Sequence, residues 1–465
     1  MTATTGFDLD SALAQVLAGH ADWRRWMPTY EPASALSVSD ERWTRALAEL
    51  QERLKDNYPF FHPLYAGQML KPPHPAAVTG YLAAMLVNPN NHALDGGPAT
   101  ARMEKECVAA FAKQFGFQEH LGHLTGGGTM ANLEALWVAR ELHPDKKIIF
   151  AENAHYTHGR MSQLLRADCE KIPAAPAGQL DFSALKALLK KDASRVGTVV
   201  VTLGTTALGA IDALSDVLAL KQKYDFRIHV DMAYGGYYHV LNDRPEFAQF
   251  KYLKDVDSVV IDPHKHGLQP YGCGCVIFSD PNVGKLYHHD SPYTYFTSDD
   301  LHLGEISLEC SRPGAAAAAL WLTMQLFPLE ADGGMGTILT QTRHAAVQLA
   351  GLLKESPSYR LYLDPQLDIV TFFPVVTNAA NNTAEISRHT RMLFHAAMQS
   401  VDYPVYLATL TVSADDFHAL HPDIEVSKDS DSVTIFRSCL MKPEHAEWVP
   451  HLMRYLEHHA QMLRG

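Results

Sequence analysis

Short apolar runs rich in β-branched residues alternate along this chain with stretches of helical periodicity, and this alternation limits the possible folds more than any other feature. The runs cover residues 147–150, 197–203, 228–231, 258–261 and 275–278. Runs of this kind are typical of strands buried on both faces, because helical crossovers cover a parallel sheet from both sides. We therefore expect an α/β fold with a mostly parallel sheet.

The C-terminal third of the chain carries a different pattern. Its strand-like segments are 369–376 and 432–441. Its expected helices cover 338–355, 384–400 and 443–462. Strands and helices of this spacing indicate a second, smaller α+β unit.

The length of 465 residues is too great for one compact core, so more than one structural unit is expected. We divide the chain into a large α/β domain at 76–330, a small C-terminal α+β domain at 331–465, and an N-terminal helical and extended segment at 1–75. Within the N-terminal part, helices are expected at 7–19 and 40–55. Residues 58–100 are rich in Pro, Asn and Gly and are expected to form loops.

The composition excludes several classes of protein. A net charge of −13 argues against nonspecific binding to nucleic acid. The chain contains no apolar run long enough for a membrane span, and its first positive charge is Arg24, so neither a span nor a secretory signal is expected. Six cysteines without a disulfide framework favour the cytoplasm, and no motif for a metal site is present.

The segment around Lys265 is the first candidate for chemistry. The apolar run 258–261 ends before Pro263, and Lys265 then lies between His264 and His266. Taken alone, a lysine is most often a surface residue. A lysine at the end of a buried strand is costly to desolvate unless it is paired or bonded covalently, for example to an aldehyde cofactor.

Two further segments would complete such a site. Asp231 ends the apolar run before that of Lys265 by about one crossover unit, so the two side chains are expected at neighbouring strand ends. The glycine turn at 126–128 leads into a helical pattern, and a helix start of this kind attracts phosphate. It matches neither a Walker loop nor a dinucleotide-binding motif.

Five motifs follow one another in a single order. They are Gly126-Gly127-Gly128-Thr129, Ala154-His155-Tyr156-Thr157, Leu203-Gly204-Thr205-Thr206, His229-Val230-Asp231-Met232-Ala233 and Asp262-Pro263-His264-Lys265. Together they resemble the group II amino-acid decarboxylases, which depend on pyridoxal 5'-phosphate (PLP), and the resemblance covers about residues 80–330. Segments 307–314, 327–330 and 435–441 are most similar to the bacterial tyrosine decarboxylase branch.

The resemblance implies the PLP-dependent transferase-like fold of fold type I, with PLP as cofactor. It also implies a homodimer whose active site lies at the subunit interface, with the N-terminal segment packed across the dimer. The implied reaction converts an L-amino acid, with an aromatic one such as tyrosine favoured, to the amine and CO2. It would run through an aldimine at Lys265 and a quinonoid.

Residue roles follow from the same resemblance. Lys265 would bind PLP covalently, and Asp231 would keep the ring nitrogen protonated. His155 and Ala233 would lie on opposite faces of the ring. The remaining contacts would come from Thr206 near the ring hydroxyl or the substrate carboxylate, and from Gly127, Gly128, Thr129 and His264 at the phosphate.

The proton donor is expected to be a tyrosine on a loop. We favour Tyr295 over Tyr293, with Tyr271 as a pocket residue. Arg312 could bind a carboxylate or form a structural salt bridge. Val87-Asn88-Pro89-Asn90-Asn91-His92 lies where the family places part of its substrate pocket, and a plain loop is the alternative.

Two other functions remain open. The Ser311-Arg312-Pro313-Gly314 segment also resembles sphingosine-phosphate lyases, which cleave a carbon–carbon bond. Aldehyde-forming relatives, which differ in the loop tyrosine, are a further alternative. A noncatalytic scaffold is the third hypothesis, which the intact Lys265, Asp231 and His155 disfavour.

Overall fold

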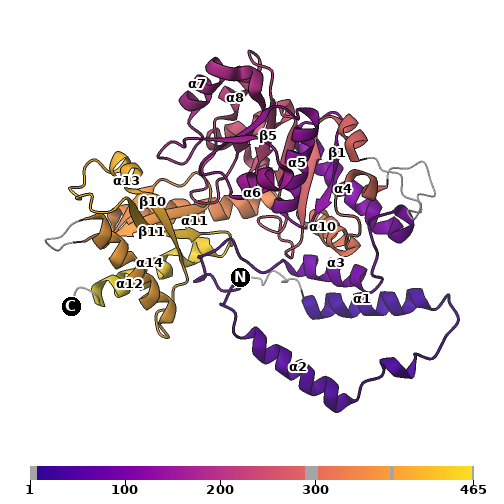
Figure 1. The fold of residues 1–465 in the computed structure, drawn as a ribbon. Coiled ribbons are helices and arrows are strands. Elements are labelled where there is room, and N and C mark those ends of the chain that lie inside the picture. The colour runs from indigo at the N-terminus through magenta and orange to yellow at the C-terminus, as the bar shows by residue number, and fades with distance from the viewer. Residues whose placement is uncertain (1–7, 288–301, 377–381, 463–465) are drawn as a thin grey trace.

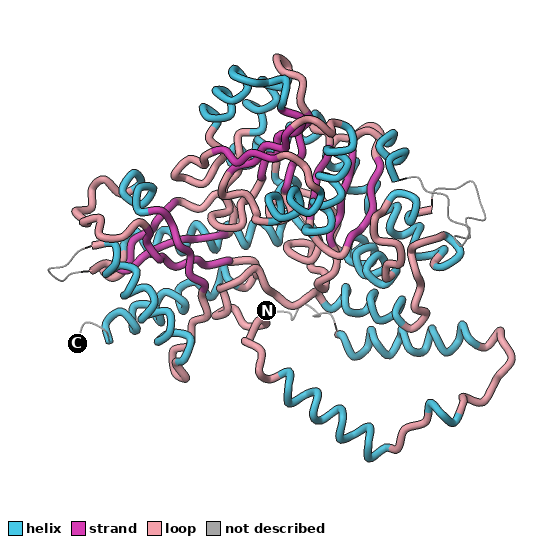
Figure 2. Tube along the Cα trace, in the orientation of Figure 1, coloured by secondary structure: helices cyan, strands magenta, loops and turns pink. Residues whose placement is uncertain are grey.

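The computed structural model describes residues 8–287, 302–376 and 382–462. Two β-sheets, each with its own helices, organise this part of the chain into two lobes (Figure 1). A helical N-terminal arm begins alongside the larger lobe and then extends away from both lobes, as the tube in Figure 2 makes clear.

The larger sheet has seven strands among the described residues, in the order β1-β7-β6-β5-β4-β2-β3. The strands are β1 (Leu121–Thr125), β2 (Lys147–Ala151), β3 (Cys169–Ile172), β4 (Val196–Thr202), β5 (Arg227–Asp231), β6 (Ser258–Ile261) and β7 (Gly274–Phe278). Only β7 is antiparallel to its neighbours. Every residue of β4, β6 and β7 is buried, because helices cover both faces of the sheet. The expected mostly parallel α/β sheet is confirmed.

Most helices of the larger lobe connect its strands or cover the sheet. They are α4 (Pro98–Phe115), α5 (Gly128–Leu142), α6 (Thr157–Leu165), α7 (Phe182–Asp192), α8 (Leu214–Lys221), α9 (Gly284–Tyr287) and α10 (Gly314–Leu326). The larger lobe also contains the 3-10 helices η2 (Leu94–Gly96), η3 (Ala193–Arg195), η4 (Gly236–Leu241), η5 (Pro245–Asp255), η6 (Pro281–Val283) and η7 (Leu303–Ile306). A further 3-10 helix, η1 (Ser34–Leu36), lies in the N-terminal arm.

Helix α3 (Pro75–Met85) corrects one expectation, because residues 58–100 were expected to form loops. The helix lies between α1 and α10 and packs closely against α10 through small residues. A Cβ atom at Gly80 would lie 3.0 Å from the carbonyl oxygen of Ala318. A helix packed on several sides needs no polar face, so its sequence lacks the amphipathic period that reveals a surface helix.

The second lobe is built on a four-stranded antiparallel sheet in the order β10-β11-β9-β8. Its strands are β8 (Tyr359–Leu363), β9 (Ile369–Pro374), β10 (Ala408–Ser413) and β11 (Ser432–Cys439). Its helices are α11 (Gly334–Glu355), α12 (Thr383–Gln399), α13 (Ala414–Leu420) and α14 (His445–Met462). The smaller α+β unit is therefore confirmed as a feature of the fold.

The N-terminal arm consists chiefly of α1 (Leu9–Arg24) and α2 (Asp40–Leu54). Every residue of α2 is exposed, although four large apolar side chains recur at helical spacing along one face. They are Trp43, Leu47, Leu50 and Leu54. Across the described ranges, no helix is long and apolar enough to cross a membrane.

One edge of the larger sheet gathers the segments that carry the sequence motifs. Strands β1, β4, β5 and β6 run in the same direction, so their carboxyl ends meet there. The glycine turn after β1 and the loops after β4, β5 and β6 follow directly from these ends. Open α/β sheets bind ligands at this edge.

Candidate active site

A cavity of about 320 Å³ lies at this edge of the sheet. Its size is at the lower end of the range for small-molecule sites, about 300–1,000 Å³. The cavity is lined by every residue that we predicted to contact the cofactor, namely Gly127, Gly128, Thr129, His155, Thr206, Asp231, Ala233, His264 and Lys265. Segments separated by more than a hundred residues of sequence therefore converge on one site.

Lys265 follows β6 and points into a largely buried environment. Its side chain is 18% exposed, and its Nζ lies 3.1 Å from Oδ2 of Asp262, which is itself buried. Pro263 between them ends the strand and turns the chain. The interpretation of Lys265 as an ordinary surface lysine is therefore wrong.

Asp231 ends β5 with both carboxylate oxygens hydrogen-bonded. Oδ2 accepts from Nε2 of His158 at 2.9 Å and from Nδ2 of Asn132 at 3.4 Å, and Oδ1 accepts from the amide of Ala233 at 3.1 Å. Burial alone would raise the pKa of Asp231. The hydrogen bond and charge of His158, the charge of Lys265 and the Ala233 amide outweigh burial and hold this pKa well below its usual range. Asp231 is thus a stable anion in the cavity.

A second layer of hydrogen bonds orients the groups that hold Asp231. His229 Nε2 lies 2.9 Å from Oδ1 of Asn132, and its Nδ1 lies 2.8 Å from the hydroxyl of Ser258. Burial lowers the pKa of His229 to about 3, so the ring is neutral and donates to the Asn132 oxygen. The Asn132 amide nitrogen is thereby turned towards Asp231.

The sequence motifs did not indicate a role for His158 or Asn132. His158 lies three residues after His155 at the start of α6, and Asn132 lies four residues after Gly128 on α5. The available signal was indirect, because a buried acid requires donors nearby but the sequence does not say which ones.

The glycine turn leads into the first turn of α5. Gly127 has φ +143°, which favours glycine, and a Cβ atom there would lie 3.2 Å from Cε1 of His264. The amides of Gly128, Thr129 and Met130 belong to the first turn, where amides have no intrahelical acceptor, and all three residues line the cavity. These donors suit an anionic group such as a phosphate.

Buried polar atoms at the same end of the cavity also suit a ligand. Nδ1 of His264 and Oδ1 of Asp262 have no hydrogen-bond partner among the described residues. Burial lowers the pKa of His264, while the charge of Asp262 acts in the opposite direction. With a lysine amine, an anionic carboxylate and a helix N-terminus in one cavity, the residues present fit PLP.

His155 and Ala233 lie on the cavity wall. Nδ1 of His155 accepts a hydrogen bond from the amide of Thr157 at 3.3 Å. Burial lowers the pKa of His155, with Asp231 opposing this change and Lys265 adding to it. A neutral imidazole can stack on an aromatic ring without a charge penalty.

Of the three tyrosines named above as candidate proton donors or pocket residues, Tyr271 alone lies within the described residues. Tyr295 and Tyr293 lie outside the described residues. Tyr271 donates from its hydroxyl to the carbonyl of Met69 at 2.9 Å, and its ring centroid lies 4.8 Å from that of His264. Tyr271 lines a second cavity, of about 880 Å³, beside the first.

Arg312 forms a structural ion pair. Its Nη1 donates to Oε1 of Glu104 at 2.6 Å and to the carbonyl of Leu124, and both side chains of the pair are buried. Asn91 donates to the other oxygen of Glu104 at 2.6 Å. The loop at 88–92 therefore belongs to this network, and none of its residues lines the first cavity. Within the described ranges, no group of three or more His, Cys, Asp or Glu side chains is arranged to hold a metal ion.

Comparison with known proteins identifies the family. Residues 35–374 match the family described as the pyridoxal-dependent decarboxylase conserved domain. The chain belongs to this family, and it is a PLP-dependent amino-acid decarboxylase.

Relatives and one solved structure illustrate the likeness. The L-tyrosine decarboxylase of Enterococcus faecium is 26% identical over 456 residues, which cover 74% of each chain. The L-aspartate decarboxylase of Thermococcus kodakarensis is 29% identical over 340 residues, covering 70% of this chain and 83% of the relative. The crystal structure of Oryza sativa TDC with PLP and tryptamine superposes with a TM-score of 0.77 at 16% identity and covers 100% of both chains. At that identity the last comparison concerns the fold alone.

Proposed function

We propose that this enzyme decarboxylates an L-amino acid with an aromatic side chain, such as tyrosine. The observation that carries the proposal is the second cavity, because Tyr271 lines it and contacts His264 of the first. Five of the fourteen described residues that line this second cavity are aromatic, namely Tyr58, Phe60, Phe61, Tyr271 and Tyr406. Aromatic rings pack favourably against one another in such surroundings. The similarity to a tyrosine decarboxylase supports the same substrate class.

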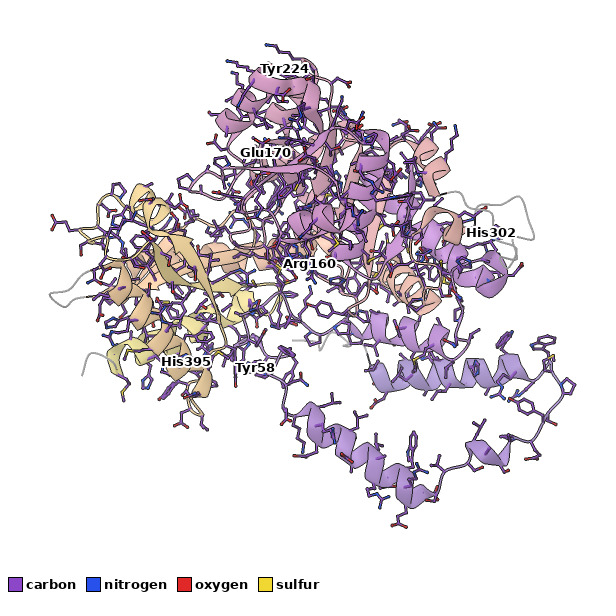
Figure 3. The ribbon with its side chains drawn as sticks, viewed as in Figure 1. Tyr58, Arg160, Glu170, Tyr224, His302 and His395 are labelled. Atoms are coloured by element: carbon purple, nitrogen blue, oxygen red, sulfur yellow. The ribbon has the colours of Figure 1, made fainter. Side chains whose placement is uncertain are left out.

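Much of this aromatic lining comes from the chain that leaves the arm. Tyr58, labelled in Figure 3, lies where that chain reaches the two lobes. Its ring centroid is 5.6 Å from that of Tyr406 in the smaller lobe. The side-chain pocket would thus depend on how the arm is held.

The residues of the first cavity would each bind a different part of the cofactor or the substrate. Lys265 would hold PLP through its Nζ and would give up this attachment to the amine of the substrate. Asp231, as an anion, would keep the ring nitrogen protonated. His155 and Ala233 would contact the ring from opposite faces, and Thr206 would contact the ring hydroxyl or the substrate carboxylate.

The phosphate would be held by Gly127, Gly128, Thr129 and His264. The chemistry that bound PLP supplies is an electron-accepting ring conjugated to the substrate α-carbon, which accommodates the electron pair left when CO2 departs. The protein would hold the bond to the carboxylate perpendicular to this ring and exclude water from it.

We assign the return of a proton to the α-carbon to Tyr295, on the resemblance of its loop to that of other decarboxylases. Tyr271 is the weaker candidate because its hydroxyl already donates to the Met69 carbonyl. Replacement of each of Tyr295, Tyr293 and Tyr271 by phenylalanine tests the assignment. Loss of amine formation is expected only for Tyr295→Phe, and full activity of that variant would contradict it.

An acidic substrate is the second candidate, for a specific reason. Lys71 lines the second cavity among the aromatic residues, and Lys55 lines it as well. Burial lowers the pKa of Lys71 to about 8, with opposing contributions from Asp368 and Glu444, so it is mostly cationic at pH 7. A partly buried cation favours a carboxylate, and one relative is named an aspartate decarboxylase.

One experiment separates these candidates. The PLP-loaded protein is incubated with each of the twenty amino acids, and CO2 and products are measured by mass spectrometry. We expect tyrosine to give its amine faster than aspartate does, and Lys71→Met to leave the tyrosine rate unchanged. Turnover of aspartate alone, abolished by Lys71→Met, would replace tyrosine by an acidic substrate. An aldehyde, a carbon–carbon cleavage product or no CO2 would contradict the proposal.

We also propose that the enzyme is a cytoplasmic homodimer in which the arm packs against the partner. The fully exposed apolar face of α2 supports this, because water-facing tryptophan and leucine side chains in a row are typical of interaction surfaces. The six free cysteines fit a reducing compartment. Sedimentation at micromolar concentration measures the oligomeric state.

A further inference from the structure

His266, directly after Lys265, is buried between two hydrogen-bond acceptors. Its Nδ1 lies 2.9 Å from the backbone carbonyl of Tyr234, and its Nε2 lies 2.8 Å from Oδ2 of Asp368. A backbone carbonyl only accepts hydrogen bonds, so Nδ1 of His266 carries a hydrogen.

The carboxylate of Asp368 is ionised. Its Oδ1 accepts from the hydroxyl of Tyr234 at 2.5 Å. Burial raises the pKa of Asp368, but the charge of His266 and the hydrogen bonds from His266 and Tyr234 outweigh burial and leave the pKa below its usual value. An ionised carboxylate only accepts, so Oδ2 of Asp368 accepts from His266. His266 and Asp368 therefore form a buried, hydrogen-bonded histidine–carboxylate pair.

This pair connects the two lobes at the cofactor site. Asp368 directly precedes β9 of the smaller sheet, whereas His266 follows Lys265 in the larger lobe. Tyr234, the other residue bound by the Asp368 carboxylate, follows Ala233 and lines the first cavity. One carboxylate from the smaller lobe thus holds the neighbours of Lys265 and of Ala233.

The residues before Asp368 contact the same edge of the larger sheet. A Cβ atom at Gly204 would lie 2.9 Å from Cδ1 of Leu367, so the loop after β4 is packed tightly against this segment. Gln366 Oε1 accepts from the amide of Ile211 at 2.6 Å. On the β11 strand, Arg437 donates to the carbonyls of Thr206 and Ala207 at 2.6 and 3.1 Å. The smaller lobe therefore touches three loops that line the cavity.

We propose that His266 and Asp368 are positioning residues, which orient the Lys265 amine towards PLP from the smaller lobe. The inference rests on the proposed role of Lys265. A buried histidine–carboxylate pair is poor evidence for stability, since an apolar pair of similar shape is often as stable, but it has a strict geometry. The turn after His266 has no slack, because a Cβ atom at Gly267 would lie 2.7 Å from the carbonyl of Pro263. A fixed His266 therefore fixes the backbone of Lys265.

A matched histidine–carboxylate pair elsewhere in the larger lobe provides a control. His123 Nε2 lies 2.9 Å from Oε2 of Glu134, and its Nδ1 lies 2.7 Å from the carbonyl of Leu124. Both side chains are buried, as His266 and Asp368 are, but these hydrogen-bond partners of His123 do not line the first cavity, whereas Tyr234, the partner of Asp368, does. Removing a charge from either pair should cost similar stability, and only one removal should disturb the cofactor.

The test compares Asp368→Asn with Glu134→Gln in PLP-loaded enzyme. Asparagine keeps the shape of the side chain and removes its charge. We expect both variants to lower the thermal midpoint, but only Asp368→Asn to change the visible circular dichroism of bound PLP. We expect its kcat to fall about tenfold or more, with KM nearly unchanged, because a small misplacement of a reacting group is costly in rate. Wild-type dichroism and kcat in Asp368→Asn, or an equal change in Glu134→Gln, would overturn the proposal.

A second variant covers the case in which Asp368→Asn does not fold. His266→Gln retains an amide donor for Asp368 without the imidazole ring, and it should also change the visible dichroism; an unchanged signal counts against the inference. The proposed function fails separately, through a wild-type protein that has no visible PLP band. A normal wild-type band with an unaltered Asp368→Asn spectrum overturns the positioning role alone.

Discussion

The edge of the larger sheet that carries the first cavity and helix α2 of the N-terminal arm differ in how their side chains are partnered. At the edge, Asp231 is buried and receives three hydrogen bonds from the chain itself. On α2, Trp43 and Leu50 are 63% and 53% exposed. The groups proposed to hold the cofactor are thus arranged within one chain, whereas the arm has an apolar face that calls for a partner. We infer that some mutations will lower the catalytic rate without weakening the dimer, and others the reverse. The second cavity connects the two properties, because the chain that leaves the arm forms part of its lining.

The largest effect is expected at the buried edge. Asp231→Ala should lower kcat on the order of a hundredfold to a thousandfold, as removal of a preorganised electrostatic group does, while PLP remains bound. Steady-state kinetics and the PLP absorbance band measure the two quantities. Asp212→Asn is the control, since Asp212 is a buried carboxylate that does not itself line the cavity; it accepts from the amide of Leu180 and from that of Thr202, a lining residue. Equal losses in both variants would remove the special role of Asp231.

Mutations on the N-terminal arm should weaken the dimer more than they lower the activity. Replacing Leu47 and Leu50 together by glutamate should raise the dimer dissociation constant at least about a hundredfold, because two buried leucines contribute ~3 kcal/mol or more. Analytical ultracentrifugation measures the shift, with activity followed at the same concentrations. Arg45→Glu, on the opposite face of α2, makes the same change in net charge and should leave the dimer intact. A double variant that stays dimeric contradicts the assignment of this face.

A moderate loss of activity is expected from a change at His158, which hydrogen-bonds to Asp231. His158→Gln keeps a donor for the carboxylate but removes the charge that lowers the pKa of Asp231. The pKa of Asp231 should therefore rise, and kcat should fall about tenfold, a change of ~1.4 kcal/mol. A loss as large as that of Asp231→Ala would mean that His158 itself contacts the reacting groups.

The last effect concerns the stability of the protein in acid and not its activity. Burial lowers the pKa of His445 to about 3, below the ordinary value of 6.5. Between these values the unfolded chain binds a proton that the folded chain does not, so the free energy of unfolding falls as the pH falls. The expected slope is about 1.4 kcal/mol per pH unit for this histidine. Denaturant unfolding between pH 7 and pH 4 should show a shallower slope in His445→Gln, and an unchanged slope would contradict neutral burial.

The sequence allowed much of this edge to be predicted, because its strands are continuous apolar runs. The segments before Asp231 and Lys265 have the pattern of buried parallel strands, so their carboxyl ends were expected to lie at the same edge of the sheet. Strand β1 was missed because it carries His123, whose burial depends on a distant glutamate. Strand β3 was missed because it is an edge strand with charged residues in its middle. Local patterns do not report partners of this kind.

The residues of the candidate site that belong to sequence motifs could be predicted, and those that only contact them could not. Lys265, Asp231 and the glycine turn carry recognisable motifs, and all nine predicted cofactor contacts line one cavity. His158 and Asn132 act through Asp231, and Asp368 acts through His266 from the other lobe. Their roles arise from contacts across the fold, so only the three-dimensional structure reveals them.

The central claim is that Lys265 bonds PLP and that the chemistry depends on this bond. Lys265→Ala protein, mixed with PLP and then dialysed, tests it through the visible absorbance band and the release of CO2 from tyrosine and aspartate. We predict that both signals disappear while the thermal unfolding of the protein stays close to that of the wild type. Retention of the band together with turnover would contradict the account.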